Sequence, residues 1–141
     1  MSAYIDTSIL GAYYCPEPGS LAAETAVRRF NSPVISALSE VEFHSLVAKK
    51  VRMKELDAAH AKAVLDLFAN HIAEGFYRRL VLTPEHYMKA RVLIDLFSIT
   101  LHTLDALHLA VSIIEQLPLM TSDQILAAAA KKHKHKVVFV K

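Results

Sequence analysis

The sequence of 141 residues has a single cysteine, only three glycines and no tryptophan. Because Cys15 is alone, an intrachain disulfide and a zinc site built from several thiolates are both excluded. No apolar run approaches the ~20 residues that a membrane-spanning helix needs. The stretch from Met1 to Cys15 lacks a basic segment and carries Asp6 among apolar residues, which is unlike a signal peptide. We therefore expect a cytoplasmic protein without a membrane partner.

The charges nearly balance, with a formal net charge of +2, and 53% of the residues are hydrophobic. This apolar share is too high for a disordered chain, and the length suits one core, so we expect a single domain over residues 1–141. The basic residues gather at residues 28–29, 49–54, 78–79 and 131–136. Such clusters fit either RNA phosphates or the solvated C-terminal ends of helices, where cations complement the helix dipole.

Short apolar segments alternate with longer amphipathic ones along the chain. The sequence predicts strands at residues 3–5, 34–35, 77–82, 119–121 and 137–140. It predicts helices at residues 7–14, 21–30, 39–50, 55–74, 84–97, 103–115 and 125–132. On the helix over residues 84–97, we expect the buried side chains to be Tyr87, Ala90, Leu93, Ile94 and Phe97. This alternation is typical of an α/β fold, which we expect to be a three-layer α/β/α domain with a short, mostly parallel sheet of about five strands.

Four carboxylates stand where a predicted strand ends or near where a predicted helix begins, namely Asp6, Glu42, Asp105 and Asp123. In open α/β sheets, ligands bind beyond the carboxyl ends of the strands, so a compact fold could bring these acids together at one edge. Four like charges in one place repel each other strongly. A hard divalent cation with oxygen ligands would relieve the repulsion, and such a cation suits phosphodiester chemistry.

Each of these acids also has a purely structural explanation. Asp6 and Asp123 could each cap the helix that follows, and Glu42 could complete a capping box with Ser39. Asp105 is the hardest to explain in this way, because leucines surround it along its predicted helix. Taken together at strand ends, the four acids favour a metal site.

A second possible metal site lies at the start of the helix predicted over residues 103–115. His102, Asp105 and His108 are spaced by three, so they share one stripe of that helix and could bind a transition metal. Each step of three positions rotates the side-chain direction by ~60°, so the three side chains rarely converge on one ion. A histidine on an apolar helix is more often a hydrogen-bonded core residue, which is the simpler interpretation.

Four motifs in a fixed order carry a resemblance to a known family. They are Tyr4-Ile5-Asp6-Thr7-Ser8, Ile35-Ser36-Ala37-Leu38-Ser39-Glu40-Val41-Glu42, Leu104-Asp105-Ala106-Leu107-His108-Leu109-Ala110 and Thr121-Ser122-Asp123. Over nearly its whole length, the chain resembles the PIN-domain ribonucleases, and specifically the VapC toxins of toxin–antitoxin pairs. The resemblance implies Mg²⁺ or Mn²⁺ held by the acids of these motifs, Asp6, Glu42, Asp105 and Asp123, with Thr121 or Ser8 as polar supports. It also implies hydrolysis of RNA that leaves a 3′-hydroxyl and a 5′-phosphate.

The resemblance further implies three partners: an RNA substrate, a cognate antitoxin protein and a second copy in a homodimer. Glu40 competes with Glu42 as the second acid, since the two side chains point about 160° apart on a helix. The motif alignment favours Glu42. Two positions depart from the family pattern: residues 132–135 fill a turn where glycine is common, and His102 stands where arginine is common. The alternative function is a non-toxic PIN-like module that processes or binds RNA.

Overall fold

The structure is a computed structural model that describes residues 1–97 and 100–141. Its strands are β1 (Ser2–Ile5), β2 (Ser32–Ser36), β3 (Arg78–Leu80), β4 (Leu119–Thr121) and β5 (Val137–Phe139). Its helices are α1 (Thr7–Tyr14), α2 (Ser20–Arg28), α3 (Ala37–Arg52), α4 (Ala58–Ala73), α5 (Pro84–Asp95), α6 (Thr103–Ile114) and α7 (Gln124–Lys132). Every predicted element is present, with ends that differ by a few residues. None of the helices in the described ranges is long and apolar enough to cross a membrane.

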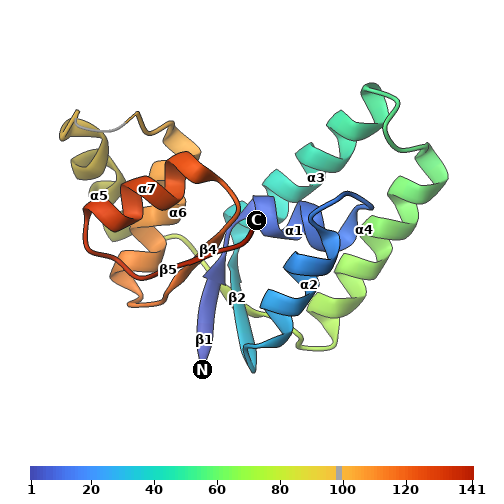
Figure 1. The fold of residues 1–141 in the computed structure, drawn as a ribbon, viewed down its shortest axis with the longest axis horizontal. Helices are drawn as coiled ribbons and strands as arrows, with labels where there is room; N and C mark the ends of the chain where they lie inside the picture. Colours follow the sequence, from blue (N-terminus) through green and yellow to red (C-terminus); the bar gives the residue numbers. More distant parts are fainter. Residues whose placement is uncertain (98–99) are drawn as a thin grey trace.

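The five strands form one parallel sheet in the order β3-β2-β1-β4-β5. From β1 the chain adds β2 and β3 on one side, and it then returns to add β4 and β5 on the other side. Helices α1 to α4 cover one face of the sheet and helices α5 to α7 cover the other, as Figure 1 shows. The predicted three-layer α/β/α fold is therefore confirmed.

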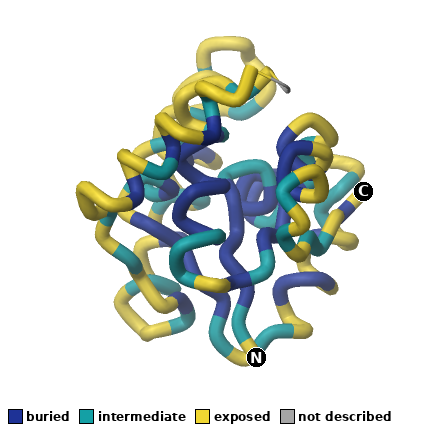
Figure 2. The backbone as a smooth tube through the Cα atoms, turned by 90° about the vertical axis from the view of Figure 1, so that its left-hand side faces the viewer, coloured by how far each residue is buried: buried dark blue, intermediate teal, exposed yellow. Residues whose placement is uncertain are grey.

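The strands contribute alternate side chains to two separate cores. Ile5 of β1 and Met120 of β4 pack with α1 to α4, whereas their neighbours Tyr4 and Leu119 pack with α5 to α7. Successive side chains of a strand point to opposite faces, so a strand covered on both faces is apolar along most of its length. Figure 2 shows the result, a buried centre within a more exposed outer layer.

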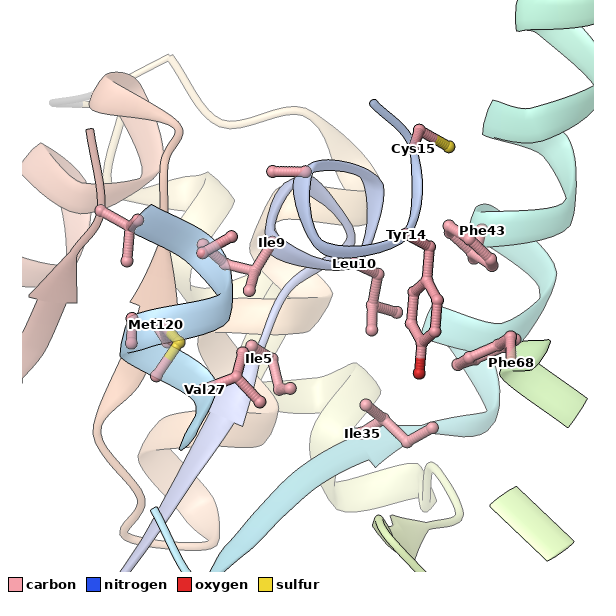
Figure 3. Packing of buried hydrophobic residues seen from close by; sticks show 14 of the residues in the cluster. Ile5, Ile9, Leu10, Tyr14, Cys15, Val27, Ile35, Phe43, Phe68 and Met120 are labelled. Carbon is pink, nitrogen blue, oxygen red and sulfur yellow. The ribbon is translucent and has the colours of Figure 1, made fainter. Parts of the chain in front are cut away.

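An aromatic cluster joins α1 to α3 and α4. Tyr14 packs against Phe43 and Phe68 with ring centroids 5.4 Å away, and those two rings lie 4.8 Å from each other (Figure 3). The Tyr14 hydroxyl lies 2.6 Å from both the hydroxyl of Tyr77 and Nδ1 of His71, so its polar end is satisfied inside the core. This cluster anchors the C-terminal end of α1, whose N-terminal end carries Asp6.

The start of α3 differs from the prediction. Ser36 is the N-cap, and it forms a capping box with Ser39, with each backbone N–H bonded to the other's side-chain oxygen at 3.2–3.3 Å. The helix therefore begins at Ala37, and the alternative of a capping box between Ser39 and Glu42 is wrong. Since the serine pair caps the helix, the carboxylate of Glu42 is free for other contacts.

The buried face of α5 is narrower than predicted. Ala90 and Leu93 are buried as expected, but Tyr87 is 52% exposed and Phe97 is 86% exposed, so their predicted burial is wrong. Helix α5 packs mainly against α6, which covers only one stripe of its surface. Phe97 lies beyond the end of α5 with a φ of 56°, so it no longer follows the helical stripe.

Candidate active site

The candidate site lies where the strand order reverses, between β1 and β4. These strands pair in parallel, with Ile5 opposite Met120. Asp6 directly follows β1, and Asp123 follows β4 after one intervening residue. The two acids therefore leave the same edge of the sheet, at the switch point where open α/β proteins form ligand sites.

Asp6 is buried and is the N-cap of α1. Its Oδ1 accepts hydrogen bonds from the Ile9 backbone N–H at 3.3 Å and from Ser8 Oγ at 2.6 Å, and its Oδ2 accepts one from Thr121 Oγ1 at 2.5 Å. Burial raises the pKa of Asp6, although the hydrogen bonds from Ser8 and Thr121 act to lower it. The cap alone needs only Oδ1. The contact between Oδ2 and Thr121 of β4 holds the carboxylate between β1 and β4, where the strand order reverses.

Asp123 is the N-cap of α7. Its Oδ1 accepts from the backbone N–H groups of Ile125 and Leu126 at 2.9 and 3.1 Å. Its own N–H donates to Thr121 Oγ1 at 2.9 Å. Thr121 thus bridges the two acids, because its hydroxyl donates to the Asp6 carboxylate and accepts from the Asp123 backbone. Among the described residues, both bonds to the Asp123 carboxylate end on Oδ1, so capping leaves Oδ2 unused.

Asp105 is half-buried in the first turn of α6. Burial raises the pKa of Asp105, and the negative charges of Asp123 and Glu42 raise it further, against the opposing effects of His108 and His102. Charges influence each other in this way only at short range. Glu42 on α3 and Asp123 at the start of α7 therefore lie close enough to Asp105 on α6 to repel its carboxylate.

Glu42 faces the other acids, and Glu40 does not. Oε1 of Glu42 accepts a hydrogen bond from Thr7 Oγ1 at 2.8 Å and is also bonded to Nε2 of His108. Burial acts to raise the pKa of Glu42, but the His108 and Thr7 contacts outweigh it and hold this pKa below its usual value. Glu40 instead forms a two-pronged ion pair with Arg79, with N–O distances of 2.9 and 3.0 Å. The geometry thus favours Glu42 as the second acid.

The sequence did not reveal the role of His108. Its Nδ1 lies 2.6 Å from the hydroxyl of Tyr4, which in turn lies 2.8 Å from Ser36 Oγ. His102 is exposed at the N-cap of α6, so the stripe of His102, Asp105 and His108 does not converge on one point. His108 is a hydrogen-bonded core residue, as the simpler interpretation held. The only sign of its partner in the sequence is a tyrosine in a strand predicted to be buried, whose hydroxyl needs a hydrogen bond.

We call Asp6, Glu42, Asp105 and Asp123 the acidic rim. It is an open arrangement: in residues 1–97 and 100–141, no three His, Cys, Asp or Glu side chains lie close enough to form a metal cage. Zinc sites are usually closed by three or four protein ligands, whereas Mg²⁺ is commonly held by one or two carboxylates and keeps several waters. The oxygen-only donors of the rim therefore fit Mg²⁺ or Mn²⁺ better than zinc.

The sequence matches the PIN domain over residues 3–132, which is most of its length. The chain belongs to the PIN domain family. The predicted resemblance is thereby confirmed, and the acidic rim lies on the edge of a PIN domain. A search of curated protein sequences returned no significant match.

Solved structures of toxins share this fold. VapC20 of Mycobacterium tuberculosis, described as a sarcin–ricin loop cleaving toxin, aligns at a TM-score of 0.71 and 18% identity, covering 90% of this chain and 94% of its own. VapBC2 of Rickettsia felis, bound to a promoter DNA fragment, aligns at a TM-score of 0.71 and 15% identity over 100% of both chains. A toxin–antitoxin complex of Klebsiella pneumoniae aligns at 0.63 and 19% identity, covering 89% of this chain and 90% of its own. At these identities the likeness is one of fold.

Proposed function

We propose that this PIN domain is an endoribonuclease that hydrolyses RNA phosphodiester bonds with the help of Mg²⁺ or Mn²⁺. One observation carries the proposal most directly. Asp6 and Asp123 leave the same edge of the sheet between β1 and β4, where Thr121 bonds to both, and Asp105 lies close enough to Asp123 and Glu42 for their charges to raise its pKa. A cluster of this kind is unfavourable unless a cation offsets it, and nucleases use such cations at the scissile phosphate.

The residues of the acidic rim would have separate roles. Asp6, Glu42 and Asp105 would hold the cation through their carboxylate oxygens, and Asp123 would complete the site or orient the attacking water. When bound, the cation lowers the pKa of a bound water and offsets the charge that grows on the phosphate. Thr121 fixes the Asp6 carboxylate by its hydrogen bond to Oδ2. In this scheme no covalent intermediate forms on the protein, and the products carry a 3′-hydroxyl and a 5′-phosphate.

We further propose that the protein is the toxin of a VapBC-type pair and acts in the cytoplasm. Two of the structures with the same fold are described as a sarcin–ricin loop cleaving toxin and as a toxin–antitoxin complex, which supports an RNA substrate and an antitoxin partner. Large apolar side chains are exposed on α2 and α5, including Leu21 at 77% and Val92 at 55%. An antitoxin and a second copy in a homodimer would cover such surfaces. A basic side chain of the antitoxin would pair with the acidic rim.

The proposal is tested by incubating purified protein with total RNA. We expect cleavage with Mn²⁺ or Mg²⁺, none with EDTA, and recovery when excess Mn²⁺ is restored. Mapping the ends of the products would show 5′-phosphates if water is the nucleophile. Cleavage that persists unchanged in EDTA would contradict a metal-dependent mechanism.

Glutamine substitutions should separate Glu42 from Glu40. Losing even a neighbour of a metal ligand typically weakens metal affinity by about 10–100-fold, so Glu42→Gln should weaken Mn²⁺ binding at least about tenfold. Glu40→Gln breaks only the partly exposed pair with Arg79 and should leave the affinity unchanged. Calorimetric titration of both variants with Mn²⁺ measures the difference. A larger loss from Glu40→Gln would reverse the assignment.

A further inference from the structure

His108 is a buried histidine next to the acidic rim, and none of the roles described so far has been assigned to it. The side chain of His108 is only 3% exposed, and both of its ring nitrogens have partners. Nδ1 lies 2.6 Å from the Tyr4 hydroxyl, and Nε2 is bonded to Oε1 of Glu42. The histidine therefore connects the core beneath β1 and β2 to an acid of the proposed metal site.

The direction of these bonds follows from simple chemistry. An ionised carboxylate can only accept a hydrogen bond, so Nε2 of His108 carries the proton and donates to Glu42. In a neutral imidazole the other nitrogen, Nδ1, is then the acceptor, so the Tyr4 hydroxyl donates to it. Ser36 on β2 lies 2.8 Å from the same hydroxyl. Tyr4 and Ser36 thus hold the imidazole ring in one orientation from two neighbouring strands.

The bonds to Glu42 leave one of its oxygens unused. In the described part of the chain, Thr7 and His108 both bond to Oε1. Glutamate has three rotatable side-chain bonds, and two contacts on one oxygen from separate elements, α1 and α6, remove most of that freedom. The carboxylate is then fixed with Oε2 as the oxygen that can reach a cation.

We propose that His108, held by Tyr4, is a positioning residue that fixes the Glu42 carboxylate with Oε2 available to the divalent cation. The inference rests on the proposed function, because it gives His108 a task only if Glu42 binds the cation. It adds a chain of hydrogen bonds from Ser36 through Tyr4 and His108 to the metal ligand. Partners of this kind orient metal ligands and tune their affinity.

Two substitutions of His108 can separate positioning from packing. The amide nitrogen of glutamine can take the place of Nε2 and donate to Glu42, whereas the shorter asparagine amide takes the place of Nδ1 and does not reach Glu42. Both substitutions remove the ring, so both should destabilise the fold to a similar degree. We expect His108→Asn to weaken Mn²⁺ affinity by about 10–100-fold and His108→Gln to stay near the wild-type value.

The chain offers a matched control. His86 is also 3% exposed at its side chain, and its Nε2 lies 3.0 Å from Oε2 of Glu115. This pair joins α5 to the far end of α6, away from the acidic rim. His86→Asn should lower the melting temperature as His108→Asn does but leave Mn²⁺ affinity unchanged.

The measurement is calorimetric titration of each purified variant with Mn²⁺, together with a thermal melt in EDTA. If His108→Asn binds Mn²⁺ as wild type does, or if the Gln and Asn variants lose affinity equally, the positioning role is refuted. If His108→Asn does not fold, Tyr4→Phe replaces it, since it removes only the hydroxyl that holds Nδ1. Unchanged Mn²⁺ affinity in Tyr4→Phe would likewise refute the role.

The Glu42→Gln variant separates a failure of the positioning role of His108 from a failure of the proposed metal site. If Glu42→Gln binds Mn²⁺ like wild type, the proposed metal site fails and the positioning role fails with it. If Glu42→Gln loses affinity and His108→Asn does not, only the positioning role fails. In a Glu42→Gln background, His108→Asn should cause no further loss, because a residue that acts through Glu42 has nothing left to orient. An additive loss in the double variant would overturn the inference.

Discussion

Replacing Asp105 or Asp6 by asparagine is expected to lower the rate of RNA cleavage at least about a hundredfold. A metal site stabilises the charge of the transition state by several kcal/mol, and each 1.36 kcal/mol changes the rate about tenfold. Asparagine has the same shape but only one acceptor oxygen and no charge. At position 6 it can still accept at the cap of α1, since that bond uses a single oxygen. The rate is measured with a labelled RNA and saturating Mn²⁺.

These two variants should remain folded, and a thermal melt in EDTA tests this expectation. Burial raises the pKa of Asp6 and of Asp105, and for Asp105 the neighbouring acids raise it further. A carboxyl whose pKa is raised by folding favours the folded state below its unfolded pKa, and this contribution is lost as the pH rises through the folded pKa. Near neutral pH in EDTA, the melting temperatures of both variants should therefore equal or exceed that of wild type, with the advantage shrinking as the solution is made acidic.

The exposed acid Asp95 at the end of α5 supplies the control for this pair. Asp95→Asn should cleave RNA at the wild-type rate and melt at the wild-type temperature. If Asp6→Asn and Asp105→Asn both cleave RNA like wild type, the acidic rim is not the catalytic site. If they lose activity only because they unfold, the melts in EDTA will show it.

Expression of the wild-type chain alone should arrest bacterial growth, and a small partner encoded beside it should relieve the arrest. An endoribonuclease with an open acidic rim acts on cellular RNA unless something covers that rim. The exposed apolar side chains of α2 and α5 give a partner surfaces to bind. Growth curves from a tightly controlled promoter, with and without the neighbouring gene, measure both effects.

Asp6→Asn expressed from the same promoter is the matched strain, since it should fold but not cleave. We expect normal growth of this strain at equal levels of soluble protein. Equal growth of both strains would instead favour the alternative of an RNA-processing or RNA-binding module. Arrest by both strains would mean that toxicity does not depend on cleavage at this rim.

The layer order could be predicted because it depends on local patterns. Strands such as β4 are short, buried and mostly apolar, as expected of a strand covered on both faces. The helices between them carry clear start signals such as Pro84 after Thr83. The placement of Asp6 and Asp123 could also be anticipated, since Asp6 directly follows β1 and Asp123 follows β4 after one residue. The capping box of α3 could not, because Ser36 and Ser39 both suit the N-cap and only the path of β2 selects between them.

The sequence by itself determined the α/β class, the short parallel strands and the positions of the acids along the chain, because periodicity and strand ends are local properties. Only the tertiary structure decided which glutamate faces the site, since Glu40 is drawn to Arg79 on β3 and Glu42 to Thr7 on α1. It also decided the task of His108, whose partners Tyr4 and Glu42 lie 104 and 66 positions away. Contacts at such separations depend on how the helices and strands pack in three dimensions, and no local pattern in the sequence encodes that packing.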